Sequence, residues 1–285
     1  MKEVGDTLIV DVNEVVEADL TPLRREDLLR KILVKSGARV KGSIVGGSVE
    51  LELGCTIEGG VLASEVVIRM ERSEHDSESV IMVGRDVVSL SSIVSVPSPL
   101  AVPGDSLMFV RGNLIASDMI RVANALIVGD VISSSVELHN IISFGVLGLT
   151  RFKKDSEVPQ SRVSNSVVFS VLSDESMEVL GDLGLVAPVI YFSPNTSVVG
   201  DGNIVLVDPE HMLRSLPELL RTARDSSFKI GDYIKNYLKV QSLYRLPVQN
   251  LPGLISFLEL EPLFLTKKRR KRLKDAFAVL VSEEL

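Results

Sequence analysis

The feature that most constrains this chain is a 17-residue repeat between Gly37 and Met70. The segment reads GARVKGSIVGGSVELELGCTIEGGVLASEVVIRM, and the aliphatic residues and glycines of its first half recur in its second half. A unit this short cannot bury its own apolar face, so it has to stack on a neighbouring unit. The repeat therefore predicts a solenoid of stacked β-strand coils.

Apolar and polar residues alternate within each unit, as strands require. Val49 and Leu51 face one side of the predicted strand, and Glu50 faces the other. A second pair of units, within residues 110–140, repeats the 17-residue spacing, with Arg121 as a polar exception at an apolar position. We expect the interior stack to consist of Val40, Ile57, Ile44, Val61, Val49, Val66, Leu51, Ile68, Leu114, Val131, Met119 and Val136.

Glycines recur at one place in all four units. These are Gly42, Gly59, Gly112 and Gly129. Glycine is favoured where the backbone adopts a positive φ or where another backbone comes very close. We therefore expect these glycines at the corners of the coils.

Composition agrees with a soluble β-rich protein. Hydrophobic residues make up 45% of the chain but aromatic residues only 5%, without any tryptophan, which favours β layers of small branched side chains. The single cysteine excludes a disulfide within one chain and a cysteine-based metal site. Acidic residues near the N-terminus argue against a signal peptide, and no apolar run is long enough to span a bilayer. We expect a cytoplasmic protein that can associate with membranes.

Changes in residue pattern along the sequence divide the chain into four parts. Residues 1–36 predict a strand followed by a capping helix, with Thr21 as its N-cap and Leu28, Leu29, Ile32 and Leu33 on its apolar side. Residues 37–149 predict about six coils of the solenoid, and residues 150–163 a linker. Residues 164–285 predict a mixed α/β domain that ends in helices, with DESMEVLGDLG as a helix between two strands.

Searches for catalytic and metal-binding patterns identify no candidate. His75, His139 and His211 do not share metal-ligand spacing, and the common phosphate-binding and hydrolase motifs are absent from the sequence. Asp208 follows a predicted strand and suits either a functional carboxylate or a helix N-cap. The sequence therefore predicts no catalytic residue, no cofactor and no metal.

A run of cations near the C-terminus is the strongest binding signal. Lys267, Lys268, Arg269, Arg270, Lys271 and Arg272 open a predicted amphipathic helix. Cations at a helix N-terminus oppose the helix dipole, so an anionic partner would compensate for them. That partner could be nucleic acid, an anionic membrane surface or an acidic face of the same protein.

The two repeat segments, GARVKGSIVGGSVELELGCTIEGGVLASEVVI and VRGNLIASDMIRVANALIVGDVISSSVEL, resemble the bactofilins, a polymer-forming cytoskeletal family. The resemblance covers about residues 37–149. It implies a right-handed β-helix with an aliphatic interior that assembles end to end without nucleotide. On this basis we expect a non-enzymatic, self-associating scaffold or cytoskeletal polymer whose main partner is itself.

Two other functions stay open at this point. In one, the β-helix is a dimerisation or docking platform that presents the basic helix to nucleic acid or an anionic membrane. In the other, the protein is an acyltransferase of the hexapeptide class with His139 as the base, although the interior positions do not advance in sixes as that class requires.

Overall fold

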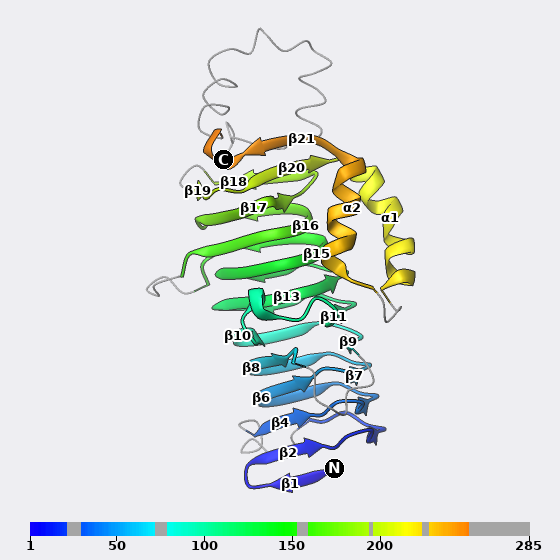
Figure 1. The fold of residues 1–285 in the computed structure, drawn as a ribbon. Helices are drawn as coiled ribbons and strands as arrows, with labels where there is room; N and C mark the ends of the chain where they lie inside the picture. The colour runs from blue at the N-terminus through cyan, green and yellow to red at the C-terminus, as the bar shows by residue number, and fades with distance from the viewer. Residues whose placement is uncertain (22–29, 72–78, 153–158, 194–195, 224–227, 251–285) are drawn as a thin grey trace.

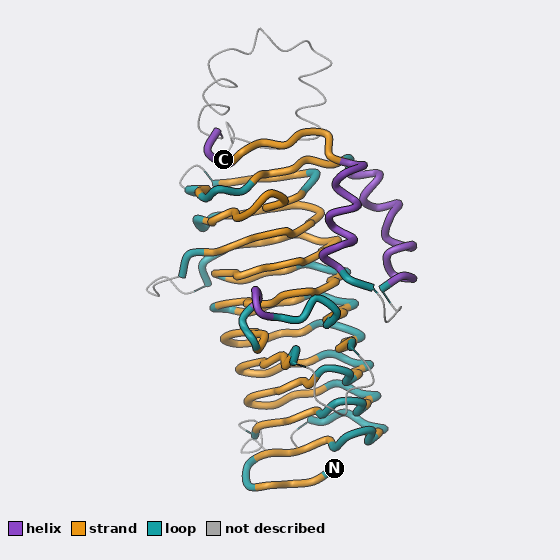
Figure 2. Tube along the Cα trace, in the orientation of Figure 1, coloured by secondary structure: helices purple, strands orange, loops and turns teal. Residues whose placement is uncertain are grey.

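The computed structural model describes residues 1–21, 30–71, 79–152, 159–193, 196–223 and 228–250. The chain is mainly β, and its strands lie across a long column in which nearly all pairs are parallel (Figure 1). The N-terminus lies at one end of the column, and the last described strand, β21, lies at the other (Figure 1). Within these residues, helices are confined to one flank of the upper half and two short 3-10 turns (Figure 2).

The column begins before residue 37. Strands β2, β4, β6 and β8 pair in parallel, one above the other, and β1 is antiparallel to β2. The predicted N-terminal helix is wrong at its end, because Ile32 and Leu33 lie in β4, where Ile32 pairs with Val49; residues 22–29 of that prediction lie outside the described residues. The elements are β1 (Lys2–Val4), β2 (Thr7–Val10), β3 (Val15–Val16), β4 (Lys31–Val34), β5 (Arg39–Val40), β6 (Ile44–Glu52), β7 (Thr56–Ile57) and β8 (Val61–Arg69).

The 17-residue register is confirmed in this region and again higher in the column. Ile44 pairs with Val61, and Leu114 pairs with Val131. Between these coils, residues 79–96 form a further coil that pairs with β8 below and with β12 and β13 above. The elements are β9 (Val80–Val83), β10 (Val87–Val96), the 3-10 turn η2 (Pro99–Ala101), β11 (Leu107–Val110), β12 (Leu114–Ala116), β13 (Met119–Ile127), β14 (Val131–Ser133) and β15 (Ser135–Leu149).

The register slips by one residue between β13 and β15. Met119 pairs with Ser135, so Ile120, and not Met119, lies under Val136. Ile120 is fully buried and Met119 only half-buried, so the prediction of Met119 as an interior residue is wrong. The same slip turns Arg121 outward, where its Nε lies 2.7 Å from a carboxylate oxygen of Glu137 on the next coil.

The parallel column continues past residue 149. β16 pairs with β15 along its length, and β17 and β18 pair with β16. The helix predicted for DESMEVLGDLG is wrong, because Met177 and Val179 point into the column as alternate residues of β17. The elements are β16 (Ser161–Ser173), β17 (Met177–Val186), β18 (Val189–Phe192), β19 (Val198–Val199) and β20 (Asn203–Val207).

The α-helices of the described chain follow the last parallel strand. They are α1 (Pro209–Thr222) and α2 (Ile230–Gln241), followed by β21 (Ser242–Pro247) and the 3-10 turn η3 (Val248–Asn250). Asp208 is the N-cap of α1, since its Oδ1 accepts a hydrogen bond of 2.8 Å from the backbone N–H of Glu210. β21 is antiparallel to β20 and lies over this end of the column.

The helices cover an apolar column on the outside of the strands. This outer column consists of Phe109, Leu126, Ile142, Val167, Val186 and Val205, each paired with the next. Met212, Leu219 and Ile234 of the helices pack against it. The parts of the strands under the helices are therefore buried on both faces, which explains fully buried apolar runs such as LMFV in β11 and IVLV in β20.

Inside the column, the expected interior residues are buried with the exception of Met119. Val40, Ile44, Val49, Leu51, Ile57, Val61, Val66, Ile68, Leu114, Val131 and Val136 are at most 2% exposed. Each paired position repeats an aliphatic side chain on the coil above, so the core is a set of aliphatic stacks. Burial of such side chains is the main stabilising term of the fold.

The four predicted glycines lie at corners, and close approach is the reason for glycine there. None of them has a positive φ. A Cβ on Gly129 would lie 2.3 Å from Asn113 Oδ1 and 2.8 Å from the carbonyl oxygen of Gly112 on the coil below. Gly42, Gly59 and Gly112 meet equally close atoms of the preceding coil.

Polar side chains at the corners form hydrogen bonds to the backbone of the next coil. Asn113 Oδ1 accepts a hydrogen bond of 2.8 Å from the N–H of Asp130, and Asp130 Oδ1 accepts one of 2.7 Å from the N–H of Val146. Asp19 and Asp86 accept equivalent bonds from Ser43 and Asn113. These bonds satisfy backbone donors where the strand ladder is interrupted.

We predict that Gly129→Ala lowers the free energy of unfolding by about 1–3 kcal/mol, because the new methyl group has to push two coils apart. Gly148→Ala is the matched control, since its Cβ would meet Ile132 at an ordinary distance of 3.5 Å. Urea unfolding followed by circular dichroism measures both. Equal stability of the two variants would contradict the close-approach explanation.

Candidate functional site

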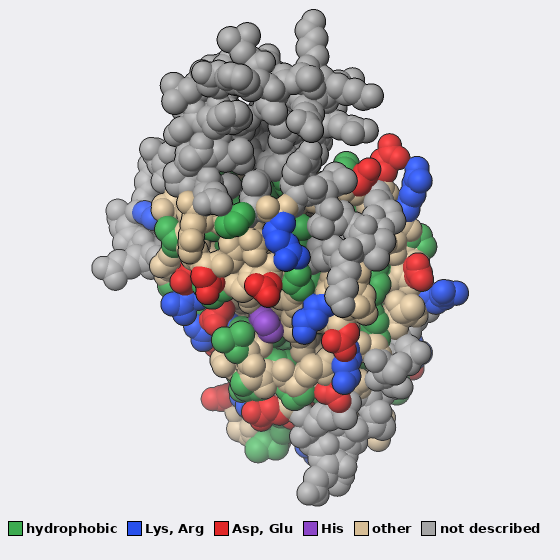
Figure 3. Space-filling view, turned by 45° about the horizontal axis from the view of Figure 1, so that its top comes forward, with side chains coloured by type: hydrophobic (Ala, Val, Ile, Leu, Met, Phe, Trp, Pro, Cys, Tyr) green, Lys and Arg blue, Asp and Glu red, His purple; other side chains and the backbone are tan. Residues whose placement is uncertain are grey.

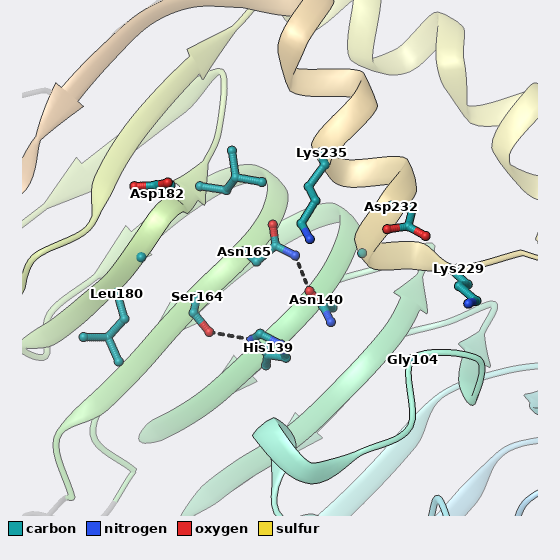
Figure 4. Close-up of a pocket in the computed structure, with 13 residues that line it drawn as sticks. Gly104, His139, Asn140, Ser164, Asn165, Leu180, Asp182, Lys229, Asp232 and Lys235 are labelled. Atoms are coloured by element: carbon teal, nitrogen blue, oxygen red, sulfur yellow. Dashed lines mark hydrogen bonds between the residues drawn. The ribbon is translucent and has the colours of Figure 1, made fainter.

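A groove of about 380 Å³ opens where the start of α2 meets the strands β15, β16 and β17 (Figure 4). We call it the flank groove. Its polar lining includes His139, Ser164, Asn165, Asp182, Asp232 and Lys235. The strand residues come from neighbouring coils: His139 pairs with Ser164, and Ser164 pairs with Leu180. Parallel stacking therefore brings together residues that are far apart in the sequence.

His139 and Ser164 are joined by a hydrogen bond of 2.8 Å between Nδ1 and Oγ (Figure 4). The Ser164 hydroxyl also donates to the carbonyl oxygen of Leu138 at 3.3 Å. A hydroxyl has one proton, so with this second bond Nδ1–H is the donor to Ser164. The contact orients the imidazole and leaves Nε2 as its acceptor, which differs from a serine activated by a histidine base.

The groove lowers the pKa of His139. Partial burial is the main cause, because it disfavours the charged imidazolium, and the positive charge of Lys235 adds to it. His139 is consequently neutral at pH 7 and can accept a hydrogen bond in the groove.

Both signs of charge line the flank groove without pairing across it. Lys235 extends from α2 toward Asn165, and Asp182 lies on the strand side (Figure 4). Neither residue forms an ion pair with another described residue. In the space-filling view, basic and acidic side chains surround a histidine on this surface (Figure 3).

The N-terminal end of the column is a second candidate surface. Within the described chain, β1 pairs only with β2 and β3 only with β5, so each leaves one edge unpaired. Four large apolar side chains in the first 16 residues are exposed: Met1 58%, Val4 61%, Val12 42% and Val15 52%. Exposed apolar side chains beside an unpaired strand edge are typical of association surfaces.

The remaining sequence candidates lie elsewhere. Lys267, Lys268, Arg269, Arg270, Lys271 and Arg272 are outside the described residues, as is His75, so binding of an anionic partner stays a prediction. His211 lies in α1. Cys55 is fully buried, and burial strongly raises the pKa of its thiol, so it packs as a small hydrophobic residue.

In the described ranges, no group of three or more histidine, cysteine or acidic side chains is placed to hold a metal ion. In the same ranges, no helix has the length and hydropathy needed to cross a membrane.

Sequence reasoning considered His139 but missed the rest of the flank groove. The available signal was an asparagine or glycine that recurs once per coil as the second residue of a dipeptide. These dipeptides are Ala-Asn at 123, His-Asn at 139, Ser-Asn at 164 and Leu-Gly at 180. These dipeptides stand in register in the structure. Their unequal spacing hides them from a search at a fixed period.

The fold and these surfaces define a mainly β protein of stacked parallel strands with a polar groove on its flank. No protein-family model, curated protein or solved structure matches the chain. The resemblance to bactofilins therefore stays a prediction.

We predict that Lys235→Gln raises the pKa of His139 toward its usual value of 6.5, because one of the two causes of the lowered pKa is removed. An NMR titration of the imidazole protons measures this shift. Lys41→Gln, far down the column, is the control and leaves the titration unchanged. An unaltered pKa in Lys235→Gln would show that the ammonium group does not act on His139.

The lowered pKa also predicts a pH dependence of stability. The His139 imidazole binds a proton more readily in the unfolded chain than in the folded chain. Its contribution to the free energy of unfolding is therefore complete above pH 6.5. It is lost as the pH falls from 6.5 through the folded-state pKa. Urea unfolding across this range shows a smaller loss in His139→Gln than in the wild type.

Proposed function

We propose that this protein is a non-enzymatic, self-associating scaffold built on a right-handed parallel β-helix. The right hand is supported by the strong preference of crossover connections between parallel strands for that hand. The observation that carries the proposal is the N-terminal end, where exposed apolar side chains adjoin unpaired strand edges. A second copy of this chain is the occupant that we propose for it.

A copy of the same end suits this surface because the contact can be self-complementary. An interface around a two-fold axis brings the same patch of both molecules together. Two β1 strands meeting across such an axis run antiparallel, which is the orientation that β1 already has toward β2. The unpaired backbone groups of each β1 strand would then pair with those of the other.

A contact between two N-terminal ends favours pairs over filaments. The exposed apolar side chains and the unpaired edges of β1 and β3 that carry the proposal all belong to this one end. A contact in which one kind of end meets itself closes after two molecules. We therefore propose a discrete dimer in place of the end-to-end polymer that the family resemblance implies.

Assembly of this kind needs no nucleotide or metal. The N-terminal end offers apolar side chains and backbone groups, whose burial and pairing supply the association free energy. The coils repeat after 17 residues where Ile44 pairs with Val61 and after 16 where Ile120 pairs with Val136, so they do not advance in the sixes of a hexapeptide acyltransferase. This spacing favours a scaffold over that enzyme class.

We predict that the double variant Val4→Asp/Val15→Asp is monomeric where the wild-type protein is dimeric. Two carboxylates per chain would have to lose their hydration in the interface. Sedimentation velocity over a range of concentrations measures the association, with and without added nucleotide or chelator. Both additions are expected to have no effect.

The matched control is Leu172→Asp, which changes an equally exposed apolar side chain (50%) on β16 in the upper half of the column. This variant stays dimeric. Circular dichroism verifies that all variants keep the strand content of the wild type. The proposal is wrong if the wild-type protein is monomeric at every concentration, or if Leu172→Asp dissociates it and the double variant does not.

A further inference from the structure

Three asparagines form a side-chain ladder at one corner of the column. Asn124, Asn140 and Asn165 are at equivalent positions on consecutive coils, and all have positive φ, of 49°, 56° and 45°. Asparagine tolerates this left-handed conformation better than other side-chain-bearing residues. Stacking of the coils therefore places the three carboxamides one above the other.

The carboxamides are hydrogen-bonded in one direction. Asn124 Nδ2 donates to the carbonyl oxygen of Pro103 at 2.7 Å, and Asn140 Nδ2 donates to Asn124 Oδ1 at 2.9 Å. Asn165 Nδ2 in turn donates to Asn140 Oδ1 (Figure 4). Each bond polarises the next, so the last oxygen in the chain is a strengthened acceptor.

The last oxygen of the ladder has no donor within the described part of the chain. Asn165 Oδ1 is buried and makes no hydrogen bond with any described residue. A buried acceptor without a partner costs stability, so native proteins nearly always satisfy it with a protein group, a water or a ligand.

The next coil continues the backbone of the ladder but omits the side chain. Gly181 follows Leu180, the partner of Ser164, and has a φ of 76° in the same left-handed region. A Cβ on Gly181 would meet no atom within 4 Å, so the space of a fourth side chain is open. This space belongs to the flank groove, which Gly181 and Asn165 both line.

We propose that the flank groove binds a small zwitterionic molecule that carries a primary carboxamide. Its –NH2 group donates to Asn165 Oδ1 and occupies the place of the missing fourth carboxamide. Lys235 and Asp182, which have no ion-pair partner among the described residues, face the carboxylate and the ammonium group of the ligand. This binding site is independent of the self-association proposed above.

A carboxamide fits this site better than a carboxylate of the same shape. A carboxylate offers only acceptor oxygens, so it would set oxygen against the Asn165 oxygen. A carboxamide also has a second N–H, for which Nε2 of neutral His139 is an acceptor. The ligand class follows from the carboxamide group that is missing above Asn165.

The first experiment compares L-asparagine with L-aspartate, which differ only in this group. Isothermal titration calorimetry on the full chain is expected to show binding of L-asparagine at least about tenfold tighter than that of L-aspartate, corresponding to about 1.4 kcal/mol. Propionamide, which lacks the charged groups, binds more weakly than L-asparagine. Equal binding of asparagine and aspartate, or no heat from either at millimolar concentration, would overturn the proposal.

A pair of variants at one position gives an independent test. Gly181→Asn adds the missing carboxamide in a conformation that asparagine tolerates, so it raises the melting temperature and removes L-asparagine binding. Gly181→Ala leaves Asn165 Oδ1 unsatisfied, so it keeps the binding while its strained φ lowers the melting temperature. If Gly181→Asn binds L-asparagine as well as the wild type does, the ligand does not occupy this place.

Discussion

The whole structure depends on the parallel register between successive coils. Neighbouring strands lie about 4.8 Å apart, so a residue at one position always meets the residue at the same position one coil away. The interior stacks of aliphatic side chains, the corner glycines with the carboxylates and amides that follow them, and the asparagine ladder all arise from this rule. A change at one position is therefore felt by its equivalents above and below and by few others.

Two apolar surfaces of the same strands explain why a groove forms where it does. The inner surface closes on itself, whereas the outer column from Phe109 to Val205 needs a cover, which α1 and α2 supply. The helices end their cover near the corner that carries the asparagines, because α2 starts beside Asn140 and Gly231 approaches its side chain. Polar residues from three coils and charged residues from one helix meet at this boundary.

Much of the column could be predicted from the sequence, because the coils from Gly37 to Met70 and from Val110 to Asn140 keep a constant period that makes equivalent residues visible. The coils after residue 149 were missed for a physical reason. Segments of different length separate the strands, so Leu138 pairs with Val163, 25 residues later, and no fixed period finds it. The segment IVLV of β20 is buried on both faces, which gives it the continuous apolar pattern of a strand in an α/β sheet. The flank groove depends on these pairings and could not be assembled without them.

The placement of α1 and α2 has a mechanical consequence. Their apolar side chains pack against strands of at least five successive coils, from β11 to β20, so the helices brace the upper half of the column against bending. In the described chain, no helix braces the coils from β2 to β8. These coils resist separation only through their backbone hydrogen bonds and their interior packing. The molecule is thus a rod of graded stiffness, which bends and opens first at the end that carries the exposed strand edges.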